Sequence, residues 1–299
     1  MGKPESKPAS TGEFSKQQDK HILVLNKDNL EEKLRNIELR ISDKYVRILV
    51  VGEVGAGKSS FINSVNNVFQ GRITCDALVD ATSGTSFTKV YKTHYIKGKD
   101  GSCLPFVFND IMGLEPEESR GAHVQDIISA LKGSLEEGHK FNPANPVSEN
   151  DYKSNPSVDQ TSCLVNVLAA DKVSLMDQRV IQKMKLIREE ASIMNLPQVI
   201  IMTKVDKACP LVGEDIRKVY TSKKIKDKMQ ECSNRLGIPM SNIFPVKNYH
   251  EEIDTDDDMD VLILKALDQI VNLGNDALIN ETSQLDEEAK PCCFIKNSP

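Results

Sequence analysis

Continuous apolar runs alternate along the chain with segments in which apolar residues recur every three or four positions. The runs are typical of strands buried on both faces of a sheet, and the periodic segments are typical of amphipathic helices. The runs predict strands at 45–51, 161–169, 199–202 and 243–246, and the periodic segments predict helices at 29–41, 61–69, 175–193, 216–236 and 261–273.

Two further strands, 87–96 and 103–108, flank the turn at residues 98–101 and predict a β-hairpin. One hairpin inside a series of alternating strands and helices predicts an α/β fold. Its sheet is expected to be mostly parallel and six-stranded, with one antiparallel hairpin strand and helices on both faces. Ligands of such sheets bind at the carboxyl ends of the strands, so candidate chemistry is sought there.

Composition divides the chain into three parts. Residues 1–28 are polar and predict a disordered N-terminal segment, residues 29–278 predict one domain, and residues 279–299 predict a flexible C-terminal tail. Inside the domain, residues 132–160 carry three prolines and few apolar side chains, which predicts a long loop. The sequence leaves the role of this loop open.

A phosphate-binding pattern, G-x-x-x-x-G-K-S, follows the first buried strand directly at residues 52–59. Backbone N–H groups of such a loop cradle phosphates at the start of a helix, the lysine reaches the β- and γ-phosphates, and the serine hydroxyl ligates Mg²⁺. The residues predicted to bind nucleotide here are Val54, Gly55, Ala56, Gly57, Lys58, Ser59 and Ser60. The loop therefore predicts binding of a nucleoside triphosphate.

A D-x-x-G pattern, Asp110 to Gly113, ends the strand at 103–108. An acidic residue there is expected to hold Mg²⁺, and the Gly113 N–H is expected to meet the γ-phosphate. A threonine in the polar stretch before the hairpin should complete the metal site. Thr82, Thr85 and Thr88 compete for this role, and Thr85 is chosen because it lies just before the strand pattern begins. The predicted metal ligands are Ser59, Thr85 and Asp110, and the candidate catalytic residues are Lys58 and Thr85.

Two later loops indicate which base is bound. Thr203-Lys204-Val205-Asp206 resembles the [NT]-K-x-D motif of GTP-binding proteins, in which the carboxylate accepts two hydrogen bonds from guanine and the lysine stem covers the purine face. Threonine in place of asparagine removes an amide that usually braces the phosphate loop. Lys247 and Asn248 follow the last strand, where backbone N–H groups face the guanine O6. The four motifs together predict a P-loop NTPase G domain with GTP or GDP and Mg²⁺ as its ligands.

Net charge and cysteine spacing indicate which ligands and which cellular compartment to expect. The formal net charge of −6 makes general nucleic-acid binding unfavourable. The seven cysteines form no C-x-x-C pair, which is typical of reduced thiols in a cytoplasmic protein, and no apolar stretch is long enough to form a transmembrane segment. Lipidation at Gly2 or at Cys292 and Cys293 is left open.

Residues 30–275 resemble the interferon-induced protein 44 family, above all in segments 52–61, 81–91, 110–115 and 260–267. The resemblance implies GTP binding, a cytoplasmic location and an innate immune setting, without a defined catalytic activity. Leu114 stands where a glutamine orients water in Ras-type enzymes, so slow hydrolysis is expected, and Leu114→Gln is predicted to test that missing group. Three functions stay open: a nucleotide-dependent interaction switch with unknown effectors, an assembly-activated GTPase acting as a homodimer through the G domain, and a pseudo-GTPase scaffold.

Overall fold

The computed structural model describes residues 27–41, 45–74, 77, 88–147 and 159–288, with side chains described as far as residue 278. Several sequence predictions concern residues outside these ranges. They are the disorder predicted for 1–28 as far as residue 26, the metal ligand Thr85, and lipidation at Gly2, Cys292 and Cys293. The last two residues of the segment predicted as disordered, 27 and 28, begin a helix.

Six strands form one sheet in the order β2-β3-β1-β4-β5-β6. Only β2 is antiparallel to its neighbour, and all other pairs are parallel, which confirms the predicted fold class. The strands are β1 (Val46–Gly52), β2 (Lys92–Lys97), β3 (Cys103–Asp110), β4 (Cys163–Ala169), β5 (Gln198–Thr203) and β6 (Ile243–Pro245).

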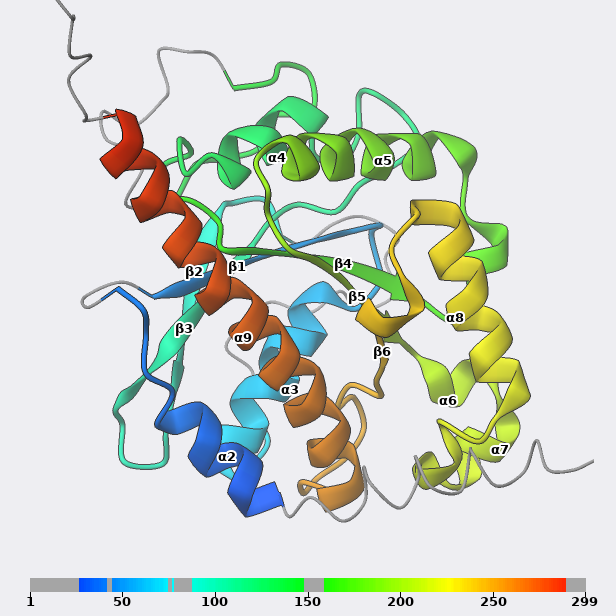
Figure 1. The fold of residues 1–299 in the computed structure, drawn as a ribbon. Coiled ribbons are helices and arrows are strands. Elements are labelled where there is room, and N and C mark those ends of the chain that lie inside the picture. The colour runs from blue at the N-terminus through cyan, green and yellow to red at the C-terminus, as the bar shows by residue number, and fades with distance from the viewer. Residues whose placement is uncertain (1–26, 42–44, 75–76, 78–87, 148–158, 289–299) are drawn as a thin grey trace, which may run out of the picture.

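Helices cover both faces of the sheet, as Figure 1 shows. One layer holds α2 (Lys27–Arg35), α3 (Lys58–Gln70) and α9 (Asp257–Glu288), and the other holds α4 (Val124–Leu131), α5 (Gln178–Ile193) and α8 (Lys223–Leu236). Two short helices, α6 (Val205–Ala208) and α7 (Pro210–Glu214), follow β5 directly.

Each face of the sheet has its own apolar core. Under α3, the rings of Phe61 and Phe108 meet edge to face at 6.1 Å, and Phe106 packs on Phe108 at 6.4 Å. These three rings are fully buried. Such aromatic pairs add to the free energy gained by burial itself, so they fix the position of α3 on the sheet. The helix that starts at the phosphate loop is therefore held rigidly.

Several predicted helices differ in extent. The first, predicted at 29–41, begins at Lys27 and ends at Arg35. The segment 216–236 is split into a short 3-10 helix (Ile216–Lys218) and α8, because the Ser222 hydroxyl accepts the Ile225 N–H at 3.3 Å and starts a new helix. The closing helix begins earlier than predicted, at Asp257, where the Asp256 carboxylate accepts the Met259 N–H at 2.9 Å. It ends at Glu288, so the boundary predicted at residue 278 lies inside a helix. Among the described residues, none of the helices combines the length and apolar character needed to cross a bilayer.

Candidate nucleotide and magnesium site

The phosphate loop leaves β1 and enters α3 through Gly57, which has a positive φ of 98°. A side chain at Gly52 would meet the Val167 carbonyl oxygen at 2.4 Å, so this exit from the strand requires glycine. The Lys58 ammonium donates to the carbonyl oxygens of Gly52 and Glu53, each at 3.2 Å. Lys58 is buried, and these two bonds hold its ammonium at the phosphate loop, where phosphates are expected.

A buried carboxylate and two hydroxyls meet at the start of α3. The Ser59 hydroxyl donates to the Asp110 Oδ2 at 2.7 Å, and the Thr88 hydroxyl donates to the same oxygen at 3.3 Å. The two hydroxyl oxygens lie 3.4 Å apart. Asp110 is only 2% exposed, and its Oδ1 has no hydrogen-bond partner among the described residues.

This oxygen set fits Mg²⁺. Mg²⁺ prefers hard oxygen ligands, keeps several waters and needs only one or two protein ligands beside the phosphates. The unpartnered Oδ1 of Asp110 is free to hold a metal-bound water, and Ser59 and Thr88 supply hydroxyl oxygens. Within the described ranges, no three His, Cys, Asp or Glu side chains cluster as an all-protein metal site.

Thr88 is the described threonine that reaches this cluster. The chosen candidate, Thr85, lies outside the described residues, so its role stays a prediction. The sequence pattern assigned residues from 87 onward to a strand, which drew the choice toward Thr85. The strand begins only at Lys92, so Thr88 belongs to the preceding loop and can turn toward Asp110.

The end of β5 and the loops that follow β5 and β6 hydrogen-bond the phosphate loop. Three side chains each donate to one of three consecutive carbonyl oxygens. Thr203 Oγ1 donates to Ala56 at 2.6 Å, Lys204 Nζ to Gly55 at 2.7 Å, and Asn248 Nδ2 to Gly57 at 3.0 Å. Threonine at position 203 lacks the side-chain amide of asparagine, and its hydroxyl bonds the Ala56 carbonyl in its place. Asn248 supplies that amide from the last loop.

Lys204 and Asp206 lie together at the end of β5. Lys204 adopts a left-handed backbone conformation with φ 55°, which lets its side chain turn back over Gly55. Burial lowers the pKa of the Lys204 ammonium, and the charge of Asp171 opposes that shift. Asp206 is half-buried at the start of α6. Asp206 therefore follows the carboxyl end of β5, the end from which Lys204 reaches the phosphate loop.

Lys247 is held by an acidic partner in its own loop. Its ammonium lies 2.7 Å from the Glu252 Oε1, and the His250 N–H donates to the Glu252 Oε2 at 2.8 Å. Burial would raise the pKa of Glu252, but the His250 N–H and the Lys247 charge outweigh it and lower the pKa to about 2. The loop is thus closed on itself by an ionised carboxylate.

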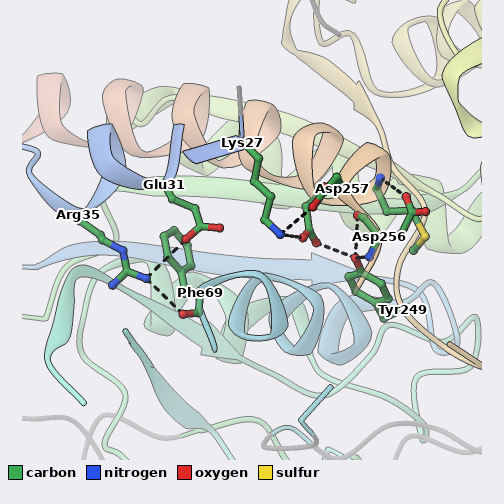
Figure 2. A network of polar contacts seen from close by, with 9 residues as sticks. Lys27, Glu31, Arg35, Phe69, Tyr249, Asp256 and Asp257 are labelled. Atoms are coloured by element: carbon green, nitrogen blue, oxygen red, sulfur yellow. Dashed lines mark hydrogen bonds and ion pairs between the residues drawn. The ribbon is translucent and has the colours of Figure 1, made fainter. Parts of the chain in front are cut away.

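Tyr249, labelled in Figure 2, anchors the same loop to α3 and α9. Its N–H donates to the Ser64 hydroxyl on α3 at 3.0 Å, and its hydroxyl donates to the Asp260 Oδ1 on α9 at 2.6 Å. The second oxygen of the fully buried Asp260 carboxylate lies 2.6 Å from the Lys27 ammonium of α2. Sequence patterns gave no signal for this network, because its members come from four separate segments. By holding Tyr249, the network also restrains the adjacent residue Asn248.

The D-x-x-G loop packs closely on the phosphate loop. A side chain at Gly113 would lie 2.7 Å from Val54 Cγ2 and 2.9 Å from the Val54 backbone nitrogen. The Leu114 N–H donates to Gly52 at 3.0 Å, and the Leu114 carbonyl accepts the Val54 N–H at 3.1 Å. The Leu114 side chain is fully buried in the apolar core. Leu114→Gln is therefore not the simple test of hydrolysis expected from the sequence, because that side chain points away from the loop surface.

No protein-family model matches the chain. Human interferon-induced protein 44-like is 33% identical over 255 residues, which cover 83% of this chain and 56% of that protein. Human interferon-induced protein 44 is 35% identical over 255 residues, which cover 83% of this chain and 57% of that protein. Over this region the chain belongs to the interferon-induced protein 44 and 44-like family. The mouse member of this family is 34% identical over 236 residues, covering 78% of this chain and 55% of its own length. The chain thus spans a little over half the length of the curated family members it matches.

Solved structures with a similar chain path include Toc33 from Arabidopsis thaliana in complex with GDP and Mg²⁺. Its TM-score is 0.46 at 14% identity, over 88% of this chain and 96% of that one. A probable GTP-binding protein, engB, has a TM-score of 0.42 at 12% identity, over 76% of this chain and 98% of that one. At these scores the likeness supports no conclusion about ligands or assembly.

Proposed function

We propose that the chain binds a guanine nucleotide with Mg²⁺ and acts as a slow, nucleotide-dependent interaction switch. One observation carries the proposal. Side chains from the end of β5 and from the loops after β5 and β6 hold three consecutive carbonyls of the phosphate loop, while Ser59, Thr88 and Asp110 cluster at its other end. A base-binding loop and a phosphate-binding loop are thereby joined into one surface.

The phosphate end works through charge and backbone donors. Backbone N–H groups of the phosphate loop would face the phosphates, apart from those of Val54 and Ala56, which donate to the Leu114 and Glu53 carbonyls. The Lys58 ammonium would move from its two carbonyl partners to the β- and γ-phosphate oxygens. Ser59, Asp110 and a switch threonine would hold Mg²⁺, which neutralises charge on the β- and γ-phosphates when bound. We assign that threonine to Thr88, with Thr85 as the alternative.

The base end selects guanine. The Asp206 carboxylate accepts hydrogen bonds from the guanine N1–H and exocyclic amine, a donor pair that adenine lacks. Lys204, already laid over Gly55, covers the purine face with its stem, and Lys247 and Asn248 close the pocket from the last loop. Selection of GTP over ATP follows from this carboxylate.

Slow hydrolysis follows from the D-x-x-G loop. The residue after Gly113 is a fully buried leucine, so no side chain at that position can orient an attacking water. The same observation favours a second function, a nucleotide-bound scaffold without hydrolysis. Family membership supports a role in the interferon response, with protein effectors still to be identified. A cytoplasmic location is part of the proposal and rests on the sequence alone.

Titration calorimetry with GTP, GDP and ATP, each with and without Mg²⁺, tests the proposal. We expect GTP and GDP to bind, ATP to bind at least about tenfold more weakly, and Mg²⁺ to strengthen GTP binding. A saturating ligand at 100 times its Kd should also raise the free energy of unfolding by about 2.7 kcal/mol. Equal binding of GTP and ATP, or no binding of either, would refute the proposal.

A further inference from the structure

Residues 132–147, the described part of the predicted long loop, pair with the chain just after Thr88. The Tyr91 N–H donates to His139 at 2.8 Å, the Gly138 N–H donates to Tyr91 at 2.9 Å, and the Phe141 N–H donates to Lys89 at 3.0 Å. These backbone bonds are antiparallel, with a bridge between Val90 and Lys140. They hold residues 89–91 in place, three residues or fewer from the threonine at the magnesium site.

Glu137 adds a side-chain link to the same site. Its carboxylate oxygens accept the Thr93 N–H at 2.9 and 3.1 Å and the Thr93 hydroxyl at 2.6 Å. The Thr93 hydroxyl in turn accepts from the Asn109 amide at 2.9 Å. Asn109 is buried and immediately precedes Asp110, the carboxylate of the magnesium site. Glu137 is thus linked to Asp110 through Thr93 of β2 and Asn109 of β3, and it holds Thr93, five residues after Thr88.

The other end of this segment is fixed to α4, the helix that follows the D-x-x-G loop. The Val147 N–H donates to the buried Asp126 carboxylate at 2.7 Å, and the His123 Nε2 donates to the Pro143 carbonyl at 2.9 Å. Phe141 and Val147 are buried in the same core as α4. The segment therefore connects α4, which follows the D-x-x-G loop, to residues 89–91 beside Thr88.

We propose that residues 137–141 are a clamp that sets the position of Thr88, and that Glu137 is a positioning residue for the Mg²⁺-bound triphosphate. This inference rests on the proposed function. Without the clamp, residues 88–93 would lose five hydrogen-bond contacts that order them in advance, three from the backbone and two from the Thr93 N–H and hydroxyl to Glu137. Ordering residues 88–93 when the nucleotide binds would then cost free energy. This cost weakens nucleotide binding only when Thr88 takes part, which is the case when Mg²⁺ is present.

Three variants test the clamp. Glu137→Ala removes the link to Thr93. Glu136→Ala is the matched control, because the neighbouring Glu136 side chain is exposed and, within the described part of the chain, Glu136 is bonded only through its backbone carbonyl. Glu137→Gln keeps an oxygen that accepts the Thr93 N–H. GTP affinity is measured by calorimetry for the full chain with Mg²⁺ and with a chelator, and GDP affinity is measured beside it.

We expect Glu137→Ala to weaken Mg²⁺-dependent GTP binding about tenfold while leaving binding in chelator unchanged. Glu136→Ala should match the parent chain, and Glu137→Gln should recover most of the loss. Unchanged Mg²⁺-dependent binding in Glu137→Ala would overturn the clamp. An equal loss of GTP affinity with and without Mg²⁺ would also overturn it, because a general loosening of the protein would weaken binding in both conditions. If the parent chain itself binds no nucleotide, it is the proposed function that fails.

Discussion

Leu114→Gln tests whether the side chain that follows the D-x-x-G motif is buried or faces solvent. The Leu114 side chain is fully buried, and its backbone is bonded to Gly52 and Val54 on both sides, so the side chain cannot turn outward without breaking those bonds. Glutamine is similar in size to leucine, so the cavity left behind is small. The cost comes from placing an amide where leucine carbons were.

The magnitude follows from two effects. Losing the apolar transfer free energy of a buried leucine costs about 2 kcal/mol, and burying an amide without hydrogen-bond partners costs about 1–3 kcal/mol. Together these effects predict a loss of about 3–5 kcal/mol in the free energy of unfolding, a large share of a typical total of about 5–15 kcal/mol. Leu114→Met conserves volume and should cost less than about 1.5 kcal/mol.

Urea denaturation of nucleotide-free protein measures the stability, and single-turnover GTP hydrolysis measures the chemistry. We expect the Leu114→Gln midpoint to fall well below that of Leu114→Met, with no faster hydrolysis in either variant. A Leu114→Gln protein of parental stability that hydrolyses GTP faster would show that this side chain faces the nucleotide. That result would refute the burial argument.

Three further predictions concern the loops around the site. Thr203→Val should weaken GTP binding several-fold and cost about 1–2 kcal/mol of stability, because the Ala56 carbonyl loses its buried donor; parental calorimetry and melting would contradict this. Lys27→Met should cost about 2–3 kcal/mol, because it leaves the buried Asp260 carboxylate unpaired, and adding Asp260→Asn should recover part of it; equal melting temperatures would argue against the pairing. Glu252→Gln should cost about 1 kcal/mol at pH 7 after allowance for solvent screening, and the cost should vanish in acid. Because the pKa of Glu252 is about 2 in the folded protein and ordinarily 4.5, its contribution is full above pH 4.5 and is lost as pH falls toward 2; a difference that persists at pH 2 would contradict the assignment.

The sequence predicted the sheet and its site motifs because these depend on local pattern. Continuous apolar runs such as 45–51 leave few alternatives to a buried strand, and the glycines and lysine of the phosphate loop have chemical reasons to be where they are. The ends of elements were less predictable. The start of α8 depends on Ser222, whose hydroxyl can either cap a new helix or lie within a continued one, and the local sequence does not distinguish the two.

The rest depended on contacts between distant segments. Three threonines in one polar stretch are equivalent until Asp110, from another strand, is placed beside one of them. The Asn248 brace joins residues 191 positions apart, and no local spacing indicates it. The burial of Leu114 had a usable signal, since Ile111 and Met112 before it are also apolar and extend the core-facing run.

Base selection by Asp206 is the central claim, and Asp206→Asn tests it most directly. The parent chain should prefer GTP to xanthosine triphosphate, and the variant should reverse that order, because an amide donates to the oxygen that replaces the exocyclic amine of guanine. Competition calorimetry with both nucleotides in Mg²⁺ measures the reversal. Unchanged GTP affinity in Asp206→Asn would contradict the proposed site.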